Sequence, residues 1–152
     1  MKETPQDKAL EERLAASKFS AQGFLGADTR TVDQIVADDL RTLERLALPL
    51  PTLHAALADA FAKARNALGA EIQIRPGLVA VAHESMGRIP SPFQGDGVFE
   101  KGDVVLSGPD GAQLVLSALG LSMIEKHAFF QGHGSRYRID PLLAARLLGL
   151  AP

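Results

Sequence analysis

The 152-residue chain contains no cysteine and no tryptophan, and only 5% of its residues are aromatic. Without cysteine, a disulfide framework, a thiolate nucleophile and a cysteine-ligated metal are all excluded. The scarcity of aromatic rings argues against a platform that stacks nucleic-acid bases. No apolar run approaches the ~18 residues that cross a bilayer, so we expect no membrane span.

An excess of positive charge is also missing. The chain has 16 basic and 18 acidic residues, a net charge of −2, and the two signs are interspersed. Proteins that grip DNA through its phosphates usually show a basic stripe, so nucleic acid is not an expected partner. Residues 1–8 are charged and lack the apolar core of a secretory signal, which predicts a cytoplasmic location.

The length and composition predict one soluble domain over residues 1–152. A chain of this size buries about 70% of its unfolded surface. Its hydrophobic fraction of 46% and charged fraction of 22% are ordinary for a globular protein. The sequence pattern changes near Gly69. Residues 1–69 have apolar residues at helical spacing, whereas residues 70–152 contain more glycine and proline and segments in which apolar and polar residues alternate.

Apolar residues at helical spacing dominate the first part of the chain. Pro49 and Pro51 interrupt this pattern, because proline ends a helix interior. We expect a loop over residues 19–28 and Gly69 just after the last helix. The pattern predicts helices over residues 6–18, from a cap at Thr29 or Thr31 to Leu46, and from a cap at Thr52 to Leu68.

After Gly69 the apolar period becomes two, which predicts strands. Two hairpins are expected, one around Pro76-Gly77 and one around Gly108–Gly111, joined by a proline-stiffened crossover. Two helices should follow, one capped by Ser117 and reaching Phe130 before Gly132, the other capped by Asp140 and ending at Gly149. The predicted class is α+β: N-terminal helices, a small antiparallel sheet of two hairpins, and two C-terminal helices.

Two glycine-rich segments hold most of the potentially reactive side chains. Residues 83–97 and 125–138 together contain three of the four histidines, the only tyrosine and three arginines. Glycine and proline beside ionisable groups give bent, exposed backbone that can approach a ligand. Within them, GRIPSPF at 87–93 and HAFFQGHGSRYR at 127–138 resemble segments of small bacterial proteins with no assigned activity. The resemblance covers mainly residues 80–140 and implies neither a catalytic residue nor a substrate.

Three motifs fail at particular positions. The His83-Glu84 pair lacks the second histidine of a zinc protease, because Gly87 stands there and the segment predicts a strand. The glycines around His133 are not followed by the Gly-Lys-Ser/Thr of a phosphate-binding loop. Ser91 is not flanked by the glycines of a nucleophile elbow.

Each histidine has a structural interpretation beside a functional one. His83 is expected on the same strand face as Val79 and Val81, as a half-buried residue at the sheet edge. His127 is expected on a helical stripe with Met123 and Phe130, as a structural histidine or as a general base or metal ligand. His133 is expected in an exposed loop, after a helix end or beside a bound anion.

Three hypotheses remain open, and they leave undecided whether the protein is an enzyme. The first is a binding or interaction domain, without a cofactor, for a small anionic ligand or a peptide end. Its candidate residues are Arg88, His127, His133, Ser135, Arg136 and Arg138. The second is a metal-dependent hydrolase with a divalent metal on His83, His127 and His133. The third is a regulatory protein that forms a homodimer through its N-terminal helices.

Overall fold

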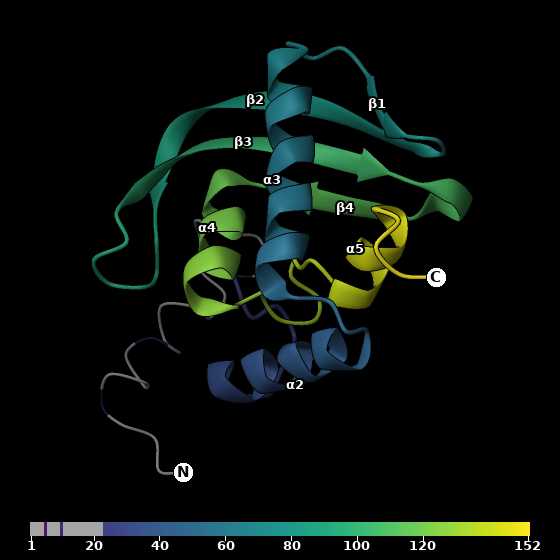
Figure 1. Cartoon of the computed structure of the whole chain (residues 1–152). Helices are drawn as coiled ribbons and strands as arrows, with labels where there is room; N and C mark the ends of the chain where they lie inside the picture. Colours follow the sequence, from purple (N-terminus) through teal and green to yellow (C-terminus); the bar gives the residue numbers. More distant parts are fainter. Residues whose placement is uncertain (1–4, 6–9, 11–22) are drawn as a thin grey trace.

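Four antiparallel strands form one sheet in the order β1-β2-β3-β4 (Figure 1). The computed structural model describes Pro5, Leu10 and residues 23–152. The sheet is a meander, in which each strand pairs with the next along the chain. The strands are β1 (Ile72–Arg75), β2 (Leu78–Pro90), β3 (Val98–Ser107) and β4 (Gln113–Leu116), with a short 3₁₀ turn, Pro109–Gly111, before the last.

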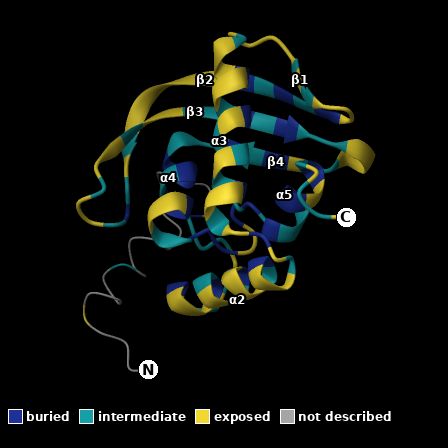
Figure 2. Cartoon of the chain, viewed as in Figure 1, coloured by how far each residue is buried: buried dark blue, intermediate teal, exposed yellow. Residues whose placement is uncertain are grey.

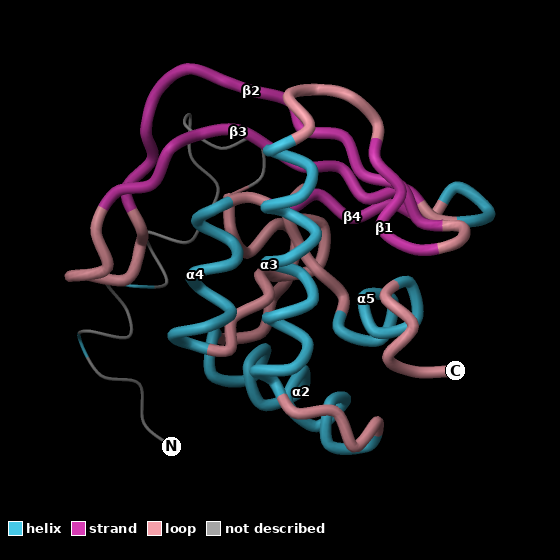
Figure 3. The backbone as a smooth tube through the Cα atoms, turned by 45° about the horizontal axis from the view of Figure 1, so that its top comes forward, coloured by secondary structure: helices cyan, strands magenta, loops and turns pink. Residues whose placement is uncertain are grey.

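The helices gather on one face of this sheet. α3 crosses in front of the strands, α4 and α5 lie beside it, and α2 lies at their far end, as the views in Figures 1 and 3 agree. No helix within the described part of the chain has the length and apolar character to cross a bilayer. The helices and the antiparallel sheet confirm the predicted α+β class. The helices are α2 (Val32–Arg45), α3 (Leu50–Asn66), α4 (Ala118–His127) and α5 (Pro141–Leu147).

Three of the expected helix starts are confirmed, because each depends on local chemistry. Thr31 caps α2 and forms a reciprocal capping box with Gln34. Ser117 caps α4 through the backbone N–H of Gly120, and Asp140 caps α5. The helix expected over residues 6–18 lies outside the described residues, as does the start of the loop expected over residues 19–28.

The boundaries of α3 and α4 differ from the prediction. α3 begins at Leu50 rather than after Thr52, with Pro49 as its N-cap, because a first-turn proline needs no N–H partner. It ends at Asn66, before the expected Leu68. α4 ends at His127 instead of Phe130, because Ala128 adopts a left-handed backbone with φ of 53°.

The crossover expected between two separate hairpins is instead the end of a long hairpin. β2 continues to Pro90 and pairs with β3 from Val98 onward, so that Arg88, Ile89 and Pro90 face Glu100, Phe99 and Val98. Pro90 is tolerated because it is the last residue of the strand. We call residues 83–103 the arm, since they extend beyond the pairing of β2 with β1 and of β3 with β4.

Two hydrophobic clusters hold the described elements together. Figure 2 shows buried residues gathered where the helices meet the sheet. The first fills the space between the helices and the inner face of the sheet, with Leu53, Leu57, Leu106 and Leu116 at its centre. The second lies beneath the arm. It joins the buried residues Val32, Ile35, Leu119, Met123 and Phe129 to the partly buried Ile89, Phe93 and Phe99 of the arm.

Candidate functional site

The loop after α4 is a structural element of the fold. Phe129 enters the second hydrophobic cluster and Phe130 enters the first, although they are adjacent in sequence. Left-handed backbone at Ala128 and Gln131, with φ of 53° and 71°, allows the chain to turn between the two clusters. Much of the composition of residues 125–138 therefore follows from packing.

The same loop lies against residues 24–28. The backbone N–H of Gly132 donates to the Phe24 carbonyl at 2.8 Å, and that of Ala27 donates to the His133 carbonyl at 2.9 Å. Gly132 is buried against the backbone of Leu25, which leaves no space for a side chain. The glycines on both sides of His133 thus serve close backbone approach rather than a ligand.

Ser135 and Arg138 point inward. The Ser135 hydroxyl donates to the Gln131 side chain at 2.9 Å, and both residues are buried. The Arg138 guanidinium forms two 2.8 Å bonds to the Asp39 carboxylate and a 2.7 Å bond to the Gln131 carbonyl. Its side chain is only 10% exposed and that of Asp39 6%. The pair of Arg138 and Asp39 therefore joins the loop to α2, whereas Ser135 holds the loop together.

His133 is exposed, and its surroundings are already paired. Its backbone N–H donates to Asp28 at 3.0 Å, and its Nε2 lies 3.4 Å from an Arg30 nitrogen. The Arg30 guanidinium binds the Asp28 carboxylate at 2.9 and 2.6 Å and also reaches Asp38 at 2.8 Å. Hydrogen bonds from Arg30 hold the pKa of Asp28 well below its usual range, against the opposing effect of burial.

This pKa shift predicts a contribution of Asp28 to stability that depends on pH. A carboxyl whose pKa is lowered by folding stabilises the protein fully above its unfolded pKa, near 4, and that contribution is lost progressively as the pH falls toward the lower pKa of the folded state. We expect Asp28→Asn to lower the free energy of unfolding at pH 7 by about 1–3 kcal/mol, since Arg30 and two backbone donors lose their charged acceptor.

Urea titrations at several pH values between 7 and 2.5 measure this effect. The difference between parent and Asp28→Asn should shrink toward low pH, where the parent loses the same interaction. Asp33→Asn is the matched control, because Asp33 lies exposed in the first turn of α2. A difference that stays constant down to pH 2.5 would show that the charge of Asp28 contributes nothing to stability.

His127 fixes the tip of the arm. Its Nε2 lies 2.6 Å from an Asp96 oxygen, and its ring stacks on Phe93 with centroids 3.8 Å apart. Phe93 in turn meets Phe129 edge to face at 5.9 Å. Because α4 ends at His127, Phe130 lies outside the helix and does not share a helical stripe with His127 as the sequence predicted, and the imidazole contacts the arm instead.

Arg136 and Tyr137 both contact Asp103, which pairs with His83 across the sheet. The Tyr137 hydroxyl donates to Asp103 at 3.1 Å, and the Arg136 guanidinium, 61% exposed, lies 3.4 Å from the same oxygen. His83 faces Asp103 across the β2–β3 ladder and is exposed rather than half-buried. Burial and the nearby Asp103 raise the pKa of Tyr137, so that it keeps its proton and donates at neutral pH.

Arg88 lies in a different place, in a groove between the C-terminal end of α3 and the arm. The open part of this groove has a volume of about 360 Å³, and a smaller hollow adjoins it toward Gly69 and Ala82. We call the two together the arm groove. It is lined on the α3 side by Arg65 and Leu68, and on the arm side by residues that include Glu84, Ser85, Met86, Arg88 and Glu100.

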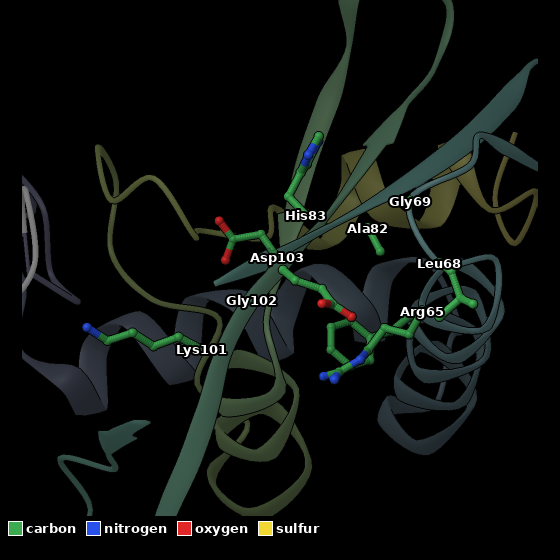
Figure 4. A pocket seen from close by; sticks show the side chains of 10 residues that line it. Arg65, Leu68, Gly69, Ala82, His83, Lys101, Gly102 and Asp103 are labelled. Carbon is green, nitrogen blue, oxygen red and sulfur yellow. The ribbon is translucent and has the colours of Figure 1, made fainter. Parts of the chain in front are cut away.

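Figure 4 shows the inner end of this groove. Arg65 reaches across from α3, beside Leu68, whereas Lys101 and Asp103 point to the opposite side of β3. Arg65 lies 3.8 Å from Glu100. Within the described part of the chain the Arg88 guanidinium has no ion pair, although Glu100 faces Arg88 across the ladder.

Two large apolar side chains are unusually exposed beside these charges. Leu68 is 82% exposed and Met86 is 95% exposed. Leu68 also has a left-handed φ of 53°, a conformation that costs a non-glycine residue about 1–2 kcal/mol. The two side chains place apolar surface beside the charged groups of the arm groove.

The six ligand residues expected from sequence are therefore distributed over several places. Of the arginines among them, Arg138 is buried in a pair, Arg136 contacts Asp103 and Arg88 lines the arm groove. Across Pro5, Leu10 and residues 23–152, no group of three or more histidine and carboxylate side chains is arranged to hold a metal ion. His83, His127 and His133 each lie among different neighbours.

The sequence does not place Arg65 and Leu68 in a site, because both fall in the helix predicted to reach Leu68. In the structure Arg65 lies in the last turn of α3 and Leu68 follows its end, and both line the arm groove. No protein family, curated protein or solved structure matches the chain.

Proposed function

We propose that the protein is a non-enzymatic binding domain whose arm groove takes the carboxyl end of an extended peptide. One observation carries the proposal: Arg88, whose guanidinium is without an ion pair among the described residues, lines the groove together with the nearly fully exposed Met86. A guanidinium offers a planar pair of donors that suits a terminal carboxylate. Met86 and Leu68 offer adaptable apolar contacts for the side chains next to that carboxylate.

The backbone of β2 supports an extended ligand. β1 pairs with β2 only over Leu78–Ala80, so among the described residues no strand borders the β1 side of β2 in the arm. An unpaired strand edge offers N–H and C=O groups to an added peptide strand. The register shift between Glu84 and Arg88 and the proline at position 90 limit that edge to a few residues.

The charges of the groove further define the ligand. Arg65 and Arg88 are accompanied by Glu84 and Glu100, so the groove has both signs. A purely anionic ligand would meet the two carboxylates as well as the guanidiniums. A peptide end with its carboxylate at Arg88 and a basic side chain toward Glu84 or Glu100 satisfies both.

Selection from a display library of random heptapeptides with free carboxyl ends tests this proposal. Peptides enriched by the parent protein should be lost with Arg88→Ala and kept with Arg146→Ala, an exposed arginine on α5 outside the groove. In calorimetric titration, replacing the terminal carboxylate of a selected peptide by an amide should weaken binding about tenfold or more, the value of a charge-assisted hydrogen bond. Equal enrichment by parent and Arg88→Ala, or none by the parent, would refute the proposed function.

A further inference from the structure

Two glycines lie at an irregular point of the arm, one on each strand. Gly87 on β2 has φ of 105° and Gly102 on β3 has φ of 134°, both in the region that favours glycine. Gly102 faces Glu84 across the ladder, and Gly87 lies beside the Lys101 side chain. The β2–β3 register shifts between Glu84 and Arg88. The ladder is therefore interrupted at one cross-section of the arm, with Gly87 inside the interruption and Gly102, which still pairs with Glu84, at its border.

The space around these glycines does not explain them. A Cβ on Gly87 would have the Lys101 side chain as its nearest neighbour at 3.7 Å, and one on Gly102 would have the His83 carbonyl at 3.6 Å. Both are ordinary contact distances, so the requirement for glycine comes from the backbone angle alone. Such residues are where a strand pair bends with least cost.

Beyond this cross-section the arm is fixed at its outer end. The tip, residues 91–97, is closed by the 2.9 Å bond from the Ser91 N–H to the Gly97 carbonyl. Phe93 and Asp96 of the tip both contact one side chain of α4, His127. Ile89 and Phe99 add apolar contacts with the second hydrophobic cluster.

We propose that the arm is a hinged flap, with its hinge at Gly87 and Gly102 and its latch at His127, Asp96 and Phe93. The arm groove lies at the hinge, since its lining includes Ser85 and Met86 on one side of Gly87 and Arg88 on the other. Opening the latch changes the angle between these side chains and so changes the groove. The link to peptide binding rests on the proposed function, whereas the hinge and the latch do not.

Spin-label distances test the flap without any ligand. Because the chain contains no cysteine, a thiol-reactive spin label attaches only to the cysteines that are introduced. The first pair is Val98→Cys on the arm with Ala62→Cys on α3, both exposed, and the second is Gln113→Cys on β4 with the same α3 label. His127→Ala removes the latch, and Asp96→Asn weakens it while preserving side-chain shape. His54→Ala is the control. His54 forms an ion pair with Glu125, with 3.5 Å between their side chains, and neither residue belongs to the arm.

In the parent, the arm pair should give one dominant distance, with an open state below about a tenth of the molecules. His127→Ala should raise the ratio of open to closed molecules about tenfold, and Asp96→Asn less. The β4 pair should be unchanged in every variant, as should both pairs in His54→Ala. If the distance distribution of the arm pair is the same in the parent and in both latch variants, the flap is refuted. If the distribution of the β4 pair broadens as much as that of the arm pair, the movement is not confined to the arm and the hinge is refuted. If peptides are selected through Arg88 but the arm pair shows no open state in any variant, the proposed function holds and the flap is refuted.

Discussion

Arg138→Met should lower the free energy of unfolding by about 3–5 kcal/mol, because it leaves the Asp39 carboxylate buried and without its partner. The two charged bonds of 2.8 Å and the bond to the Gln131 carbonyl are lost together. Methionine fills part of the vacated volume, so the cost is mainly that of the unpaired charge. Urea unfolding followed by circular dichroism measures it.

Arg136→Met is the matched control. Arg136 is two residues away in the same loop but 61% exposed, and its contact with Asp103 is a longer one of 3.4 Å. Exposed ion pairs of this kind contribute about 0–1 kcal/mol. If the two variants lose similar stability, the assignment of Arg138 to the fold is wrong. In the double variant Asp39→Leu/Arg138→Met, removing both charges should restore part of the loss, because no charge remains unpaired.

The contrast between these two arginines shows where sequence reasoning stops. Both lie in one glycine-rich segment, and the sequence predicts that both contribute to binding one anionic ligand. Arg138 instead meets Asp39, which lies 99 positions earlier on α2. No local pattern indicates such a pairing, because it depends on how α2 and the loop after α4 are brought together.

Local chemistry was far more predictable. The side chains of Thr31, Ser117 and Asp140 cap the helices that follow them, and Pro76-Gly77 turns between β1 and β2. Each of these depends on a few adjacent residues. The arm was missed for the opposite reason. The prolines at 90 and 92 indicate that strand β2 ends before them. The strand nevertheless continues to Pro90, because it pairs with β3 and because Phe93 and Asp96 beyond it contact His127.

The arm groove combines both kinds of information. Arg88 was singled out from sequence because it stands beside glycine and proline. On the opposite side of the groove lie Arg65, in the last turn of α3, and Leu68, which follows that helix, and no spacing rule connects them to Arg88. The site is thus an outcome of packing α3 against the sheet, and only one of its cations was visible beforehand.

Gly132→Ala should be nearly as destabilising as the loss of Arg138, although it adds only one methyl group. The new Cβ would lie within 2.8 Å of the Leu25 carbonyl carbon and 2.9 Å of the Asp28 Cβ, closer than real contacts allow. The obstacle is backbone, so no side-chain rotation relieves it, and the segment at 24–28 must move. Its bonds would weaken with it, from Gly132 to Phe24 at 2.8 Å and from Ala27 to His133 at 2.9 Å. We expect a loss of about 3 kcal/mol, the upper end for overpacking.

Gly95→Ala separates this clash from the general cost of replacing glycine. Gly95 has φ of 91° and nothing within 4 Å of its added Cβ, so alanine there pays only backbone strain of about 1–2 kcal/mol. Hydrogen exchange locates the difference. The amides of Ala27 and Gly132 should exchange faster in Gly132→Ala and at the parent rate in Gly95→Ala, after correction for global stability. If Gly132→Ala is as stable as Gly95→Ala and both amides stay protected, the loop after α4 and residues 24–28 are not packed as tightly as their backbone contacts require.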